Sequence, residues 1–391
     1  MRSNKKRILL MSDDLRMHSG IATQSKEFVM GTMHKYEWVQ IGAAINHPEK
    51  GGIIDMNEAA RNETGIKDAY LKIYPTSGYG DPDSLREIIE IEKPDAILHF
   101  TDPRFWIWMY QMEHEIRQNI PIFYYNIWDD LPTPNYNRDY YRSCDLLMGI
   151  SKQTYGINKR ILKNYNYEDW QIQYVPHGIN HTKYFKIDEG DTKFKKFEQK
   201  HSLDKYNFKI LYLNRNIRRK QPGDVVLAYK HFMDGLTEEQ RKECCLVFHT
   251  APVDENGTDL RAVCNAMIPD YNIVFTHDND LHFDDEKMNF IYNSADVYIN
   301  LASNEGFGLG SAEALMTETP IIVNVTGGLQ DQCGFKKQKP HESGAGSSLE
   351  YLTADDYVEL GSNHRGEYQE HGEWVKPVFP SNISLQGSPL T

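Results

Sequence analysis

The chain has 391 residues, of which 40% are hydrophobic and 25% are charged, and this composition excludes a disordered protein. Acidic residues outnumber basic ones by 56 to 43, and the net charge of −13 argues against a broad basic surface for nucleic acid or an anionic membrane. No run of about 18 apolar residues is present, so we expect no membrane span. The apolar run from Ile8 to Met11 is too short for the core of a signal peptide, and we expect a cytoplasmic protein.

Neither the cysteines nor the paired aspartates predict a metal site. The five cysteines include no Cys-x-x-Cys pair, so we expect reduced thiols rather than structural zinc or disulfides. Asp81 with Asp83, and Asp278 with Asp280, resemble Asp-x-Asp sites for hard cations. Both pairs lie among Pro and Asn residues, where aspartate is favoured in turns, and the turn interpretation is preferred. We therefore expect neither a metal nor a cofactor.

Short β-branched or aromatic runs alternate with amphipathic stretches in the first half of the chain. Strands are predicted at residues 7–11, 37–43, 95–100, 121–126, 146–150 and 172–175, with helices from residue 21 and at 82–92, 105–118 and 153–163. This alternation indicates parallel β-α-β units. Aromatic residues at 105–110 would line an acceptor cleft or, at helical spacing, pack in the core, and the core interpretation is preferred.

A polar, charged segment at residues 187–206 predicts a linker with a short surface helix. The alternation then restarts. Strands are predicted at residues 208–213, 245–249, 272–275, 297–301 and 320–323, with helices at 222–232, 260–267, 286–292 and 308–316. From residue 332 the pattern fails and predicts an irregular extension, and we expect closing helices to be missing from these 391 residues.

The two alternating halves define the predicted fold. We predict an α/β protein with two Rossmann-like, doubly wound domains facing a cleft, in which ligands bind at the carboxyl ends of the strands. The predicted parts are an N-terminal domain at 1–186, a linker at 187–206, a C-terminal domain at 207–331 and the extension at 332–391.

The most informative motif is the glycine-rich stretch from Ser303 to Met316, which follows a predicted strand and leads into a predicted helix. Its three glycines let the backbone approach a ligand closely, and the N–H groups and positive dipole end of the helix suit a phosphate. Glu305 lies in the loop and Glu313 in the helix, where each carboxylate could accept hydrogen bonds from sugar or ribose hydroxyls. The alternative is a glycine-rich turn with two solvated glutamates.

A basic cluster from Asn214 to Lys220 directly follows the first predicted strand of the second half. Its four basic residues make a local anion site in an acidic protein. Arg215 and Lys220 are the predicted clamp for a diphosphate, and the alternative is a solvated basic loop.

In the first half, the loop at residues 13–23 follows the first predicted strand, where doubly wound folds place a ligand loop. It contains His18 and Gly20. The lone glycine is weak evidence, and His18 is either a surface histidine or a substrate contact.

Further candidates lie at the ends of later strands. His99, Thr101 and Asp102 follow one another at the end of the strand at 95–100, and with His18 they form the candidate acceptor side. His99 is either a catalytic group or a packed core histidine, and the core is preferred. The pair Asp129 and Asp130 would act as general bases or as ordinary surface charges.

The spacing from Glu305 to Glu313 resembles the signature of the family 4 glycosyltransferases, which retain anomeric configuration and have the GT-B architecture of two Rossmann-like domains. The resemblance extends from residue 146 to residue 331, is weaker before that and fails after 332. Further matching segments are Val175 to Asn180, Asn214 and Arg215 with Lys220, Ser294 to Tyr298, and Pro320 to Gly328.

The resemblance implies a role for each matching residue. Arg215 and Lys220 would hold the donor diphosphate, and Glu305 would contact the donor sugar, so these three form the catalytic set. The implied donor-binding groups are the N–H groups of Phe307, Gly308 and Leu309, the carboxylate of Glu313 on the ribose, and Gly20 beneath the diphosphate. The family usually needs no metal ion.

We therefore predict a cytoplasmic, metal-independent hexosyltransferase that uses a nucleotide sugar. Its acceptor stays undetermined among a glycan, a small molecule and a modified DNA base. A composition rich in Lys, Asn, Ile and Tyr suits an AT-rich, phage-like genome, and viral enzymes of this fold glycosylate modified bases. The third alternative is a non-catalytic nucleotide-sugar-binding protein, because Thr101 stands where the family often has a histidine.

Overall fold

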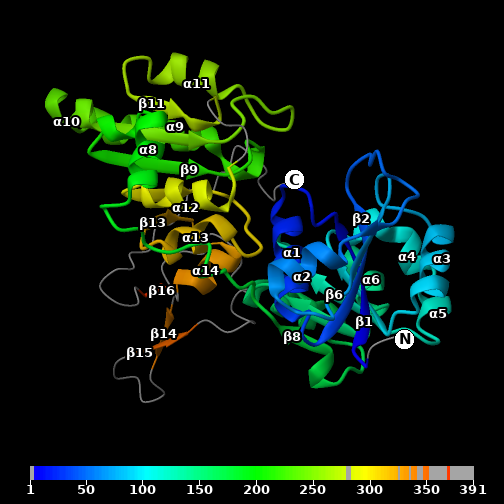
Figure 1. The fold of residues 1–391 in the computed structure, drawn as a ribbon. Coiled ribbons are helices and arrows are strands. Elements are labelled where there is room, and N and C mark those ends of the chain that lie inside the picture. Colours follow the sequence, from blue (N-terminus) through cyan, green and yellow to red (C-terminus); the bar gives the residue numbers. More distant parts are fainter. Residues whose placement is uncertain are drawn as a thin grey trace. The chain divides into compact units, whose positions relative to one another are not determined.

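The computed structural model describes residues 4–278, 283–324, 326–333, 336–340, 347–351 and 368–369. The chain divides into two compact units (Figure 1). Unit 1 comprises Met1–Asp129 and Thr133–His177, and unit 2 comprises Asp130–Pro132 and Gly178–Thr391. Residues 178–186, which we expected in the first domain, therefore belong to unit 2.

Unit 1 is built on one eight-stranded sheet with the order β3-β4-β2-β1-β5-β6-β7-β8. Every neighbouring pair is parallel except β3 and β4. The strands are β1 (Lys6–Asp13), β2 (Tyr36–Ala43), β3 (Ile54–Asp55), β4 (Leu71–Pro75), β5 (Ala96–Phe100), β6 (Ile122–Asn126), β7 (Leu146–Gly149) and β8 (Ile172–Tyr174).

Helices cover both faces of this sheet, with α1 and α2 on one side of the strands and α3, α4 and α5 on the other (Figure 1). Central strands such as β1 are therefore nearly continuous apolar runs, and Leu9 and Met11 are fully buried. The helices are α1 (Gly20–Thr32), α2 (Asn57–Thr64), α3 (Pro82–Glu92), α4 (Ile107–Gln111), α5 (Glu113–Ile116), α6 (Arg138–Arg142) and α7 (Lys152–Leu162), with short 3-10 turns η1 (Pro103–Trp106), η2 (Asn135–Asn137) and η3 (Asp169–Gln171).

Local signals explain where α3 begins. The carboxylate of Asp81 accepts hydrogen bonds from the N–H groups of Asp83 and Ser84, and Pro82 occupies the first helical turn. The pair Asp81 and Asp83 is thus part of a helix cap, in agreement with the turn interpretation. Of the second pair, Asp278 ends a 3-10 turn and Asp280 lies outside the described residues.

Residues 105–118 do not form the single helix that we predicted, because they are divided among η1, α4 and α5. Trp106, Met109 and Tyr110, at the spacing of one helix face, are buried, as the core interpretation predicts. Phe105 and Ile107 are exposed.

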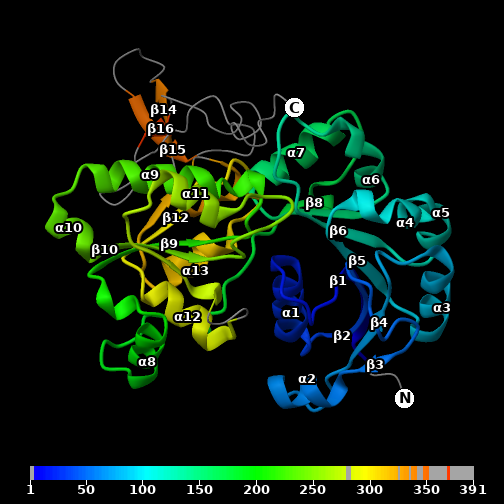
Figure 2. The ribbon, with the colours of Figure 1, turned by 90° about the horizontal axis from the view of Figure 1, so that it is seen from above.

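Unit 2 contains a five-stranded parallel sheet with the order β11-β10-β9-β12-β13. Figure 2 shows α9 and α11 on one side of these strands and α12 and α13 on the other. The strands are β9 (Phe208–Leu213), β10 (Cys244–His249), β11 (Ile273–Phe275), β12 (Val297–Asn300) and β13 (Ile321–Val323). The helices are α8 (Thr192–Lys200), α9 (Pro222–Asp234), α10 (Glu238–Glu243), α11 (Leu260–Met267), α12 (Asp285–Asn293), α13 (Leu309–Met316) and α14 (Gly327–Cys333). The 3-10 turns are η4 (Leu203–Lys205), η5 (Arg218–Lys220) and η6 (Thr276–Asp278).

Alternate side chains of these strands pack in two apolar clusters, one on each face. Tyr212 and Phe248 belong to the cluster with α9 and α11, whereas Leu211 and Val247 belong to the cluster with α12. This two-sided burial fixes β9 and β10 in the core of unit 2, and the segment that carries the basic cluster begins at the end of β9.

The last segment is more regular than we predicted. In its described part, β14 (Lys336–Pro340) pairs antiparallel with β15 (Ser347–Tyr351) and with β16 (Tyr368–Gln369). None of the helices in the described part of the chain has the length and hydropathy of a membrane-spanning segment.

Candidate functional site

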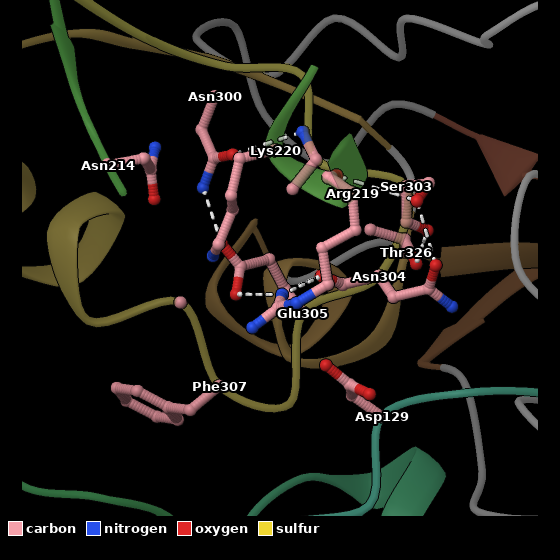
Figure 3. A network of polar contacts seen from close by, with 12 residues as sticks. Asp129, Asn214, Arg219, Lys220, Asn300, Ser303, Asn304, Glu305, Phe307 and Thr326 are labelled. Atoms are coloured by element: carbon pink, nitrogen blue, oxygen red, sulfur yellow. Dashed lines mark hydrogen bonds and ion pairs between the residues drawn. The ribbon is translucent and has the colours of Figure 1, made fainter. Parts of the chain in front are cut away.

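The two charged motifs of unit 2 meet where the strand order changes direction. The chain runs outward from β9 to β10 and β11, and on the other side from β12 to β13, so β9 and β12 are the adjacent strands between the two series. Ligands of doubly wound sheets bind at the carboxyl ends of such a pair. The loop after β9 carries the basic cluster, and the loop after β12 carries the glycine-rich motif (Figure 3).

A buried ion pair joins these two loops. The Nζ of Lys220 contacts Oε1 of Glu305, and Asn300 at the end of β12 donates to the same oxygen at 2.9 Å. The guanidinium of Arg219 lies 3.7 Å from the other carboxylate oxygen. Burial raises the pKa of Glu305, but the charges of Lys220 and Arg219 outweigh it and hold the pKa below its ordinary value. Glu305 is therefore a buried, ionised carboxylate.

Backbone contacts fix the two loops against each other. The N–H of Ser303 donates to the carbonyl of Arg219 at 2.8 Å, and the Arg219 side chain donates to the carbonyl of Asn304 at 2.7 Å. The hydroxyl of Thr326 donates to the carbonyl of Ser303 at 3.0 Å. The charged groups are thus held on a rigid frame before any ligand arrives.

The paired glycines at the start of α14 form part of this frame. The φ of Gly327 is +41°, and a Cβ at this residue would lie 1.9 Å from the carbonyl oxygen of Glu305. A Cβ on Gly328 would lie 2.5 Å from the carbonyl oxygen of Gly306. Only glycine allows α14 to approach the backbone of the motif so closely.

The motif continues into the start of α13. Gly308 occupies the N-cap position with a φ of +88°, and no side chain caps the helix. Gln332 of α14 donates to the carbonyls of Phe307 at 2.6 Å and Gly308 at 3.1 Å, which fixes the turn. The N–H groups of Phe307, Gly308 and Leu309 thus lie at the positive end of a helix, a favourable place for an anion.

Glu313 lies within α13 and is also buried. The hydroxyl of Tyr292 in α12 donates to its Oε2 at 2.6 Å, and Tyr184 forms a second hydrogen bond with it. Burial raises the pKa of Glu313 above its ordinary value, although the two tyrosines act in the opposite direction. The two glutamates of the motif therefore have opposite electrostatic environments, and neither is the solvated glutamate of the alternative interpretation.

Two of the three arginines of the basic cluster, Arg215 and Arg219, are placed differently. The side chain of Arg215 is 65% exposed, and its Nε pairs with Asp254 at 3.0 Å. The cation beside Lys220 at Glu305 is Arg219, to which the sequence analysis assigned no role. The sequence did offer a signal for Arg219, because this residue directly precedes Lys220. Both residues lie in η5, and both side chains pair with Glu305 in the loop after β12.

Unit 1 has a corresponding change of strand order between β1 and β5. At the end of β1, Asp13 accepts a hydrogen bond of 2.9 Å from Ser19, which caps α1, and Gly20 is the first residue of that helix. His18 and Gly20 are both exposed.

His99 at the end of β5 is fully buried, as the core interpretation predicts. Its Nδ1 lies 2.7 Å from the hydroxyl of Tyr110, and its ring stacks on Tyr124 with centroids 4.9 Å apart. Burial lowers the pKa of His99 to about 3, so the imidazole is neutral. Thr101 is also buried, and the carboxylate of Asp102 caps η1 and pairs with Arg104.

The acidic pair after β6 is divided between the units. Asp129 ends a segment of unit 1, whereas Asp130 belongs to unit 2 and accepts a hydrogen bond of 2.7 Å from Asn304. Burial raises the pKa of Asp130.

In the described part of the chain, no three His, Cys, Asp or Glu side chains form a group that could hold a metal ion.

Two Rossmann-like units of this kind define the GT-B class of fold, and solved structures agree. The chain is similar to Alr3699/HepE from Anabaena in complex with UDP and glucose, at 12% identity and a TM-score of 0.58 over 83% of this chain and 82% of that one. It is also similar to sucrose-phosphate synthase from Thermosynechococcus elongatus, at 14% identity and a TM-score of 0.60 over 84% of both chains. A third similar structure is the E. coli trehalose-6-phosphate protein bound with UDP-2-fluoro glucose, at 14% identity and a TM-score of 0.60 over 84% of this chain and 86% of that one.

Residues 175–351 match the family described as Family 4 Glycosyltransferase in conflict systems. The resemblance to the family 4 glycosyltransferases is thereby confirmed for residues 175–331, which contain both charged motifs of unit 2. The match extends to residue 351, past residue 332, where we expected the resemblance to fail. A search of curated proteins gave no match.

Proposed function

We propose that this protein transfers a hexose from a nucleoside diphosphate donor to an acceptor hydroxyl, with retention of anomeric configuration and in the cytoplasm. The observation that carries the proposal is the buried Lys220 and Glu305 pair, which lies at the strand-order change of unit 2. Cations, a carboxylate and the start of α13 converge there, and together they match the charge distribution of a sugar diphosphate.

Each group has a role in the donor complex. Lys220 and Arg215 would hold the diphosphate. Arg219, which lies beside Glu305, would add a further positive charge to the site. Glu305 would contact the sugar hydroxyls, and Glu313 would accept hydrogen bonds from the ribose. Two of the structurally similar proteins bind UDP or a UDP-sugar, which supports UDP as the nucleotide.

In the proposed reaction, the bond between the anomeric carbon and the diphosphate oxygen breaks, and its electron pair remains on the diphosphate. A bond forms from the acceptor oxygen to the same face of the sugar, and the proton of the acceptor hydroxyl passes to the departing diphosphate oxygen on that face. Negative charge therefore develops on the leaving diphosphate. Pre-placed cations stabilise that charge without a metal ion, and each tenfold in rate corresponds to about 1.4 kcal/mol of such stabilisation.

A thermal-shift measurement with UDP, GDP, ADP and CMP and their sugar derivatives, without added metal, tests the donor site. A ligand that binds only the folded state raises the melting temperature by mass action. We expect a shift with the UDP series that is lost in Lys220→Ala and kept in Lys230→Ala, a control in α9 whose lysine pairs with Asp234. A folded wild-type protein that responds to no nucleotide would contradict the proposal.

A non-catalytic nucleotide-sugar-binding protein is the second candidate, because the histidine at the end of β5 is buried and neutral. The two candidates differ in turnover. The proposed enzyme releases UDP from the donor in the presence of acceptor, or slowly to water, and the α or β configuration of the product follows from NMR. Binding of donor with no release of UDP under either condition would favour the second candidate.

A further inference from the structure

We infer that unit 1 carries a binding site for a neutral, hydroxyl-rich sugar ring, built from the stacked Tyr79 and Phe105 rings beside Asp102 and Arg104. The inference rests on the proposed function, because this sugar would be the acceptor of the transfer. Tyr79 follows β4 and the other three residues follow β5. All four thus lie beyond the carboxyl ends of parallel strands, where ligands of doubly wound sheets bind.

The aromatic part of the site is an exposed ring on a fixed base. Phe105 is 51% exposed and stacks on Tyr79 with ring centroids 4.5 Å apart and an interplanar angle of 10°. Tyr79 rests edge-on against the fully buried Trp106, and Trp108 donates to the Tyr79 carbonyl at 3.2 Å. The aromatic surface is therefore ordered in advance, which lowers the entropic cost of binding. The apolar C–H face of a sugar ring can bury against such a surface.

The polar part lies in the same turn. The carboxylate of Asp102 accepts from the N–H of Arg104 at 2.9 Å and from its guanidinium Nη2 at 2.5 Å. The Arg104 side chain is 53% exposed, and its guanidinium lies 5.1 Å from the ring centre of Trp128. The contacts with Asp102 and Trp128 hold the guanidinium in place. A planar donor group joined to a carboxylate offers both donors and acceptors to neighbouring hydroxyls.

Local charge favours a neutral ligand over a nucleic acid. The carboxylates of Asp13 and Asp102 both act on Tyr79, whose pKa is raised by burial and by these two negative charges. Arg104 is paired with Asp102 rather than placed for a phosphate. A DNA acceptor would need basic side chains around the site to contact its phosphates. At this site the two carboxylates of Asp13 and Asp102 outnumber the one guanidinium of Arg104.

The test uses the full chain with a panel of mono- and disaccharides and, separately, duplex DNA. Saccharide binding is first measured by NMR saturation transfer without donor, so that it does not depend on the proposed transfer. Phe105→Ala should weaken saccharide binding by roughly tenfold, as expected for the loss of a stacked aromatic contact. Trp170→Ala is the matched control, because Trp170 is 57% exposed and lies in η3 of the same unit.

In transfer assays, Phe105→Ala should raise the acceptor KM by a similar factor and leave the UDP-glucose affinity unchanged. The inference is overturned if no saccharide binds, if Phe105→Ala binds saccharide like the wild type, or if duplex DNA is the substrate and binds in a salt-sensitive manner. Failure of the proposed function has a different signature, which is loss of UDP binding or of UDP release with saccharide binding intact.

Discussion

The ammonium group of Lys220 and the carboxylate of Glu305 form a buried pair between two loops that lie 85 residues apart in the sequence. Both side chains are largely shielded, with exposed fractions of 11% and 7%. Asn300 and Arg219 supply further contacts to the carboxylate. Because each charge compensates the other in a low-dielectric environment, removal of one partner leaves an uncompensated buried ion.

We predict that Lys220→Ala lowers the free energy of unfolding by about 3 kcal/mol and abolishes UDP-glucose binding. The double variant Lys220→Ala with Glu305→Gln should recover most of the stability, because no buried charge is left unpaired. It should not recover donor binding, since the diphosphate still lacks its cation. Urea denaturation and calorimetric titration measure the two effects separately. Recovery of both by the double variant would show that Lys220 has only a structural role.

Much of the fold follows from local sequence signals. The bounds of β9, α3 and α11 agree with the predicted ranges, since each is a periodic run between polar or capping residues. The prediction missed α2 and β4. Leu71 and Ile73 of β4 alternate as a strand should, but the run has five residues and ends on a proline, so the signal is short.

The site was predictable only in part, for a geometric reason. Glu305 and Lys220 each follow a parallel strand, so their sequence positions place them at the same edge of the sheet. Their contact also requires β9 and β12 to be neighbours, which follows from the strand order of the structure. Tyr292 reaches Glu313 through the packing of α12 against α13, and Tyr184 reaches it from the segment before α8, where its ring lies against Tyr292; no local pattern encodes either contact. Phe105 belongs to an aromatic run in which some side chains are buried and others are exposed, and its own exposure depends on where η1 begins.

Gly327 provides a test of the frame around the motif. Gly327→Ala places a Cβ against the carbonyl of Glu305 at a positive φ, and we expect a loss of about 3 kcal/mol in the free energy of unfolding. The control is Gly223→Ala in the first turn of α9, where a Cβ would meet no atom within 4 Å. That variant should be neutral or slightly more stable. Equal stability of the two variants in urea denaturation would contradict the close approach of α14.

The ion pair of the exposed Arg215 with Asp254, whose own side chain is 12% exposed, makes a prediction about the diphosphate clamp. If Arg215 holds the diphosphate, its guanidinium exchanges Asp254 for phosphate oxygens, and this exchange costs little because the guanidinium is already largely in solvent. Arg215→Ala should weaken UDP-glucose binding by about tenfold, as the loss of a charge-assisted hydrogen bond predicts. Asp254→Asn should strengthen binding by up to about fivefold, because the competing carboxylate charge is gone. If both variants bind like the wild type in calorimetric titration, Arg215 is not part of the clamp.

Glu313 should make donor binding depend on pH. Its carboxylate accepts ribose hydroxyls best when ionised, and its pKa is raised by burial, so the affinity for UDP-glucose should fall as the pH drops through that raised pKa. The fall should therefore begin at a higher pH than an ordinary glutamate would give, within a titration from about pH 8 to pH 5. Glu305, whose pKa is held below the ordinary value, stays ionised over this range.

Tyr292→Phe should shift the pH dependence of UDP-glucose binding to higher pH. The hydroxyl of Tyr292 donates to Glu313 at 2.6 Å and lowers the pKa of the carboxyl, so its removal raises the pKa further. The affinity of Tyr292→Phe for UDP-glucose should therefore decline at a higher pH than that of the wild type, whereas Glu313→Gln should show no decline that depends on this group. Tyr229→Phe removes a hydroxyl that bonds the carbonyl of Asn272 elsewhere in unit 2, and it should keep the wild-type profile. Identical pH profiles for Tyr292→Phe and the wild type would show that Tyr292 only fills space beside α13.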